Sequence, residues 1–228
     1  MTEAEWLSCT TPTLIWDYLY EKRNLRKLQL AACACCRRIW HLLPEKYRFF
    51  AELSEQAADG LVTDEQLNVA WDADKDDRWI SNPEATAVVV ASGLMAGIRG
   101  EYDFDCAGTY ALSAITGQPC RYGDSDELDL TIPAVAAEQE AQTRLLRCVT
   151  GNPFRPVTID LSWRAWNDGT ISKLAQVIYD ERAFDRLPIL ADALEEAGCT
   201  NADILAHCRL PGEHVRGCWV LDLLLGKS

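Results

Sequence analysis

A group of sulfur- and imidazole-bearing residues lies near the carboxyl end of the chain. Three cysteines and two of the three histidines fall between residues 199 and 218, with the spacing C-x7-H-C-x5-H-x3-C. Thiolate sulfur and imidazole nitrogen are the ligands that zinc prefers, and a structural site needs four of them around one point. The sequence therefore indicates a candidate zinc site drawn from Cys199, His207, Cys208, His214 and Cys218.

Helical spacing predicts how these ligands would be presented. His214 and Cys218 are four residues apart, so on one predicted helix they would share a face and form a chelating pair. His207 or Cys208 would come from the preceding helix, and Cys199 from the turn before it. The pattern lacks the C-x2-C pair of most structural zinc sites. The alternative is that the cysteines pack as small buried hydrophobic residues, in which case we expect no cofactor.

The thiol of Cys218 offers a second alternative, a cysteine-dependent enzyme. His214 would be its base, and Asp222 is the acid on the same stripe. Asp222 lies eight residues from His214, roughly 12 Å along a helix, so it could not orient the imidazole as a catalytic triad requires. No catalytic residue is assigned. The other cysteine group, at residues 33–36, is predicted to pack in the core.

Tryptophans are the candidate partner-binding residues. The chain has eight, and most are expected to pack between helices. Trp163 and Trp166 lie in a proline-containing segment, and Trp79 follows the charged run DADKDDR. Large aromatic side chains often anchor protein partners, so Trp79, Trp163 and Trp166 are predicted to contribute to an interaction surface.

Charge and composition limit the classes of function. The net charge of −13 opposes nucleic-acid binding and favours a protein partner with a basic face. Motifs for phosphate binding or for a nucleophilic serine are absent from the sequence. No apolar run approaches 18 residues and the first residues do not resemble a secretory signal, so no membrane association is expected. The ten cysteines are then expected to be reduced thiols in the cytoplasm.

Apolar residues recur every three or four positions through most of the chain, which predicts helices. Thr2 and Asn24 are expected to cap helices, Pro12 to occupy a first turn, and Thr63 with Gln66 to form a capping box. The carboxyl-terminal helices are predicted at 172–184, 187–198, 201–210 and 212–226. The predicted fold is all-α, a compact orthogonal array of about nine to eleven helices with little or no sheet. One domain is expected over residues 1–228, with residues 152–168 as the place for any sub-division.

Several phrases of the chain resemble an uncharacterised paralogous family of planctomycete bacteria. They are LQLAACACCRRIW and FDRLPILADALEEAGCTNADILAHCRLPGEHVRGCWVLDLLLGK, supported by the opening MTEAEWLSCT and by YDERAFDRLPILADAL. The similarity covers both ends of the chain and is loose across residues 60–150. It carries no known activity, so no site residue is transferred. The resemblance implies a bacterial intracellular module present in many copies, which favours an interaction or adaptor module with an acidic surface and no catalysis.

Overall fold

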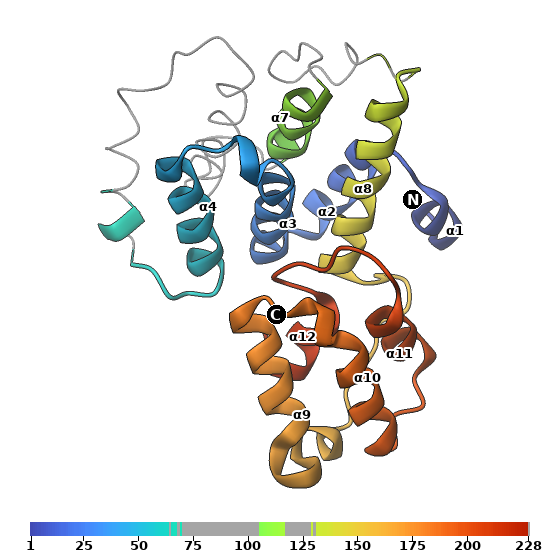
Figure 1. Cartoon of the computed structure of the whole chain (residues 1–228). Helices are drawn as coiled ribbons and strands as arrows, with labels where there is room; N and C mark the ends of the chain where they lie inside the picture. Colours follow the sequence, from blue (N-terminus) through green and yellow to red (C-terminus); the bar gives the residue numbers. More distant parts are fainter. Residues whose placement is uncertain (64, 68, 70–104, 117–128, 130, 228) are drawn as a thin grey trace. The chain divides into compact units, whose positions relative to one another are not determined.

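The structure, a computed structural model, describes residues 1–63, 65–67, 69, 105–116, 129 and 131–227 (Figure 1). These residues form ten α-helices and two short 3-10 helices, and none of them forms a strand, which confirms the all-α prediction. The chain divides into two compact units, Met1–Leu146 and Arg147–Ser228. The division falls inside a helix, a few residues before the segment 152–168 in which the sequence indicated a sub-division.

The first unit is built around one buried helix, α3 (Leu25–Arg38), which packs against α2 (Pro12–Lys22), α4 (Glu45–Ala58) and α7 (Asp105–Thr116). It also contains α1 (Glu3–Ser8), the 3-10 helix Trp40–Leu42 and most of α8 (Pro133–Thr150). Cys33, Cys35 and Cys36 are all buried in α3, as predicted. Burial raises the pKa of the Cys36 thiol well above its ordinary value, with Cys33 and Cys35 adding to the rise. These cysteines therefore act as small apolar residues of the core.

Local hydrogen bonds at the helix starts match the sequence prediction. Thr2 forms a capping box at the start of α1, and Asn24 caps α3 through its side chain. Pro12 occupies the first turn of α2. The backbone N–H of Gln66 donates to Thr63 Oγ1, and the backbone N–H of Thr63 donates to Gln66 Oε1, so this capping box also forms. Each motif depends only on residues within one helical turn, which is why the sequence reveals it.

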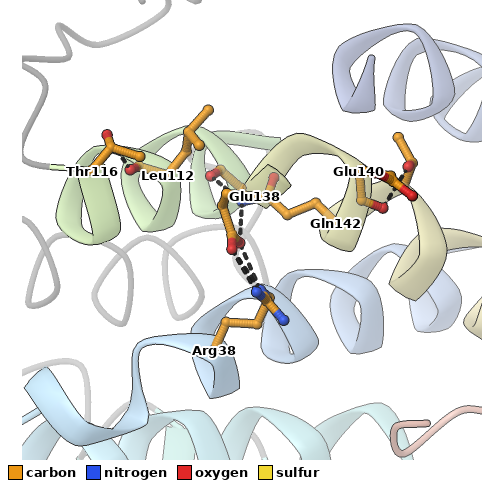
Figure 2. Close-up of polar contacts among 8 residues, drawn as sticks. Arg38, Leu112, Thr116, Glu138, Glu140 and Gln142 are labelled. Atoms are coloured by element: carbon orange, nitrogen blue, oxygen red, sulfur yellow. Dashed lines mark hydrogen bonds and ion pairs between the residues drawn. The ribbon is translucent and has the colours of Figure 1, made fainter. Parts of the chain in front are cut away.

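A buried ion pair ties three helices of the first unit together (Figure 2). The Arg38 guanidinium donates to both carboxylate oxygens of Glu138 on α8 at 2.6–2.9 Å. Gln142, one turn further along α8, donates to Glu138 Oε1 at 3.2 Å and to the carbonyl of Gly108 on α7 at 2.9 Å. The Glu138 side chain is only 2% exposed, so its carboxylate needs Arg38 as the partner that compensates its buried charge.

The second unit has a small helical core of its own. It comprises α9 (Leu161–Glu181), the 3-10 helix Phe184–Arg186, α10 (Leu187–Glu196), α11 (Ala202–Arg209) and α12 (Trp219–Leu225). α9 is interrupted at residues 166–169, where three consecutive residues have positive φ, and regular helix resumes after Gly169 as the sequence predicted. The core side chains come from α9, α10 and α12, and include Ile171, Ile178, Leu190, Leu194 and Leu221.

The predicted helix over residues 212–226 is wrong in its first half. Residues 210–218 form a loop, and helix begins only at Trp219. Gly217 has a φ of +86°, outside the helical region, and the Cys218 amide donates to the Val215 carbonyl to close a turn. His214 and Cys218 are therefore not one turn apart on a helix.

The ion pair in the first unit predicts a large difference between two carboxylates of α8. Replacing Glu138 by Ala leaves the half-buried Arg38 without its partner, and we expect a loss of about 2 kcal/mol, reduced from the fully buried case because Arg38 is 23% exposed. Glu140 forms an exposed pair with Arg144 on the same helix, so Glu140→Ala should lower stability by less than about 0.5 kcal/mol. Urea unfolding followed by circular dichroism measures both. Equal small losses would contradict the assigned role of Glu138.

Candidate metal centre

Four ligand-capable side chains of the second unit meet at one point. They belong to Cys148, His207, His214 and Cys218, and their ligand atoms all lie within 4.8 Å of one another. His207 Nε2 is 3.2 Å from Cys218 Sγ and 3.9 Å from Cys148 Sγ, while His214 Nδ1 is 3.5 Å from Cys148 Sγ. Among the described residues, this is where such side chains gather closely enough to hold a metal ion.

Two distant parts of the chain position these side chains: Cys148 comes from α8, and the other three lie within residues 207–218. Cys148 lies in the last turn of α8, within the part of that helix that belongs to the second unit. His207 lies on α11, whose start is fixed by the Asn201 side chain accepting from the Ile204 amide. His214 comes from the loop 210–218, and Cys218 is the residue immediately before α12. The loop replaces the predicted helix at the place where the chain must turn to bring both residues to the site.

The spacing of the atoms suits a tetrahedral ion. Zinc–sulfur and zinc–nitrogen bonds of ordinary length place sulfur and nitrogen ligands about 3.6 Å apart in a tetrahedron. Three sulfur–nitrogen separations in the group, 3.2, 3.5 and 3.9 Å, lie on both sides of that value. Cys148 and Cys218 are buried and the two imidazoles are half-buried, so such an ion would be largely shielded from water.

The surroundings of Cys218 favour its thiolate form, which is the form that binds metal. Burial alone would raise the pKa of Cys218, but its contacts with Cys148, His207 and His214 outweigh burial and lower that pKa well below its ordinary value. For His214, burial lowers the pKa and contact with Cys218 raises it, with a net rise. Thiolate is the form of cysteine that binds metal, so the environment prepares Cys218 as a ligand.

His214 also has a contact that fixes which nitrogen faces the sulfurs. Its Nε2 lies 3.5 Å from the carbonyl oxygen of Leu210 and, when protonated, can donate a hydrogen bond to that oxygen. In the tautomer protonated at Nε2, the unprotonated Nδ1 points to Cys148. An imidazole held in this way by an outer acceptor is the usual arrangement at a protein metal site.

The structure brings together three of the five residues selected from the sequence: His207, His214 and Cys218. Cys199 and Cys208 are not members of the group. Both are buried, and burial raises the pKa of each thiol, with the negative field of Cys218 adding to the rise at Cys208. They are therefore held as neutral thiols in the core, which is the alternative that the sequence left open for them.

Cys148 is the ligand that the sequence reasoning missed. It lies 51 residues before Cys199 and on the far side of the irregular segment 152–168, so no local spacing connects it to the histidines. The available signal was weak: a cysteine in the last turn of a helix, three residues before the glycine that ends it.

The tryptophans selected as partner-binding residues have different outcomes. Trp79 lies outside the described residues. Trp163 and Trp166 lie at the start of α9, where both are half-buried, so each retains some exposed surface. Their role in binding a partner stays a prediction.

Comparison with known proteins found no family model, no curated protein and no solved structure that matches this chain. The resemblance to a planctomycete family stays a prediction. Within the described part of the chain, no helix has the length and apolar character needed to cross a membrane.

Serine substitutions distinguish the four-residue group from its neighbours. Cys148→Ser and Cys218→Ser each replace a soft sulfur ligand, and we expect Co²⁺ affinity to fall by at least about 100-fold. Cys199→Ser and Cys208→Ser are matched controls in the same unit and should change affinity only a few-fold. Competition with a chromogenic chelator measures each affinity. A larger loss from Cys208→Ser than from Cys148→Ser would show that the wrong sulfurs have been assigned.

Proposed function

We propose that this protein binds one zinc ion through Cys148, His207, His214 and Cys218, and that the ion has a structural role in the second unit. The observation that carries the proposal is the convergence of two sulfurs and two ring nitrogens within 4.8 Å, from α8, from α11 and from the loop that follows α11. Two thiolates and two imidazoles are a ligand set that a structural zinc site uses.

The ligand set selects the metal. Two thiolates and two imidazoles in tetrahedral reach suit zinc, whereas calcium and magnesium require oxygen ligands. None of the four donor atoms is an oxygen. Zinc is therefore the metal that the chemistry of this group favours.

The number of ligands supports a structural role over a catalytic one. Catalytic zinc sites usually have three protein ligands and leave the fourth position to water or substrate, whereas four protein ligands close the site. The helices near the site are short: α10, α11 and α12 have ten, eight and seven residues. Helices of this length are marginal alone, so a cross-link between α8, α11 and the start of α12 would stabilise the unit substantially.

A closed metal site agrees with a non-catalytic module, and we extend the proposal to an adaptor that binds a protein with a basic face. The net charge of −13 supports this choice of partner. Three arginines of the first unit, Arg26, Arg37 and Arg38, pair with the chain's own carboxylates, so they do not present free positive charge. Eight of the ten cysteines are free thiols in the structure, which supports a reducing compartment such as the cytoplasm.

Metal removal tests the structural role. Protein purified under reducing conditions should contain one equivalent of zinc. At free zinc about 1,000-fold above its dissociation constant, the ion should stabilise the folded protein by about 4 kcal/mol over the chelator-treated form. Guanidinium unfolding with and without zinc measures the difference, and Cys148→Ser/Cys218→Ser is the control in which zinc should have no effect. Failure of the wild-type protein to bind zinc, or zinc binding without any gain in stability, would contradict the proposal.

A further inference from the structure

A tryptophan packs against one of the proposed ligands. Trp219 is the first residue of α12 and follows Cys218 directly. Its ring centroid lies 5.2 Å from that of His207, with the planes tilted by 53°. The His207 ring in turn meets His214 edge to face, at 4.9 Å. The His207 ring therefore contacts two other rings, that of Trp219 and that of His214.

Trp219 rests on a position that only glycine can occupy. Gly151 ends α8 with a φ of +69°, and its amide donates to the Arg147 carbonyl at 2.8 Å. A Cβ atom on this residue would lie 3.0 Å from Trp219 Cγ and 3.1 Å from Cδ2. Any larger residue would be strained by its φ and would also push the indole away. The same glycine terminates the helix one turn after Cys148.

The two histidines of the site differ in how their rings are held. His214 has the Leu210 carbonyl behind its second nitrogen. For His207, the contacts formed by the ring nitrogens involve Nε2 and the two sulfurs, and among the described residues its Nδ1 has no hydrogen-bond acceptor. An imidazole bound to metal usually depends on an acceptor at its second nitrogen for orientation. At His207 none of the described residues supplies such an acceptor, and Trp219 supplies a ring contact.

From this geometry we infer that Trp219, seated on Gly151, is the positioning residue that holds the His207 imidazole toward the metal and thereby sets the affinity of the site. The inference rests on the proposed zinc function. Without the indole, the His207 ring can rotate and carry Nε2 away from the sulfurs. The indole also covers the half-buried imidazole, which limits the access of water to the metal–nitrogen bond.

Zinc affinity of tryptophan variants tests the inference. Trp219→Ala should weaken zinc binding by about 10–100-fold, the usual effect of removing an outer residue that orients a ligand. Trp219→Phe keeps an aromatic face against His207 and should stay within a few-fold of wild type. Gly151→Ala should also weaken binding, because the added methyl group displaces the indole. Trp163→Ala is the matched control, since Trp163 is a half-buried tryptophan of the same unit without a ring contact to any ligand.

A second measurement separates orientation of His207 from general damage to the fold. Nitrogen NMR of the histidine rings in the zinc-loaded protein reports which ring nitrogen binds metal. In Trp219→Ala we expect the Nε2 signal of His207 to move toward its unbound position, while the Nδ1 signal of His214 stays that of a bound nitrogen. Equal loss at both histidines would assign the effect to unfolding and overturn the inference.

The outcomes also separate this inference from the zinc proposal. If wild-type protein binds zinc tightly and Trp219→Ala binds it equally well, the positioning role is refuted and the zinc site stands. If wild-type protein binds no zinc, both proposals fall together.

Discussion

One feature constrains the rest of the second unit: two buried sulfurs and two imidazole rings lie within reach of one point in space. Their sulfur and nitrogen atoms are 3.2–3.9 Å apart, and polar groups taken out of water in this way need partners. A single cation with four ligands satisfies all of them at once. The local structure follows that requirement, since α8 ends one turn after Cys148 and the chain remains a loop from residue 210 until Cys218 has reached the site.

The two units are stabilised by different polar interactions set into apolar cores. In the first unit, Arg38 and Glu138 form a buried pair supported by Gln142, and α3 supplies much of the apolar packing. Such a pair orders the helices it joins without requiring any ligand. In the second unit, the corresponding place is taken by four side chains that could hold a metal ion and that we propose bind zinc. Metal supply would therefore govern the stability of the second unit specifically.

Interactions between residues close in the sequence could be predicted, whereas interactions between residues far apart in the sequence could not. The caps at Thr2 and Asn24 were predictable because each involves neighbours within one turn. Cys148 was not, because its partners lie 59 and more residues away. Cys208 was offered as an alternative to His207 from the same helix, but successive residues on a helix point about 100° apart, so the two side chains face different ways.

The loop at 210–218 shows a second kind of limit. The sequence shows glycines at 212 and 217 but does not show which of them interrupts the helix; in the structure Gly217 has a φ of +86° and the helix begins at Trp219. The effect on the site is large, because His214 and Cys218 reach it through a turn instead of through one helix face.

X-ray absorption at the zinc edge of the purified protein identifies the atoms that bind the metal. We expect two sulfurs at about 2.3 Å and two nitrogens at about 2.0 Å, with the more distant scattering of imidazole rings. A shell of four sulfurs, which would draw in Cys199 and Cys208, or a shell of light atoms alone, would contradict this expectation.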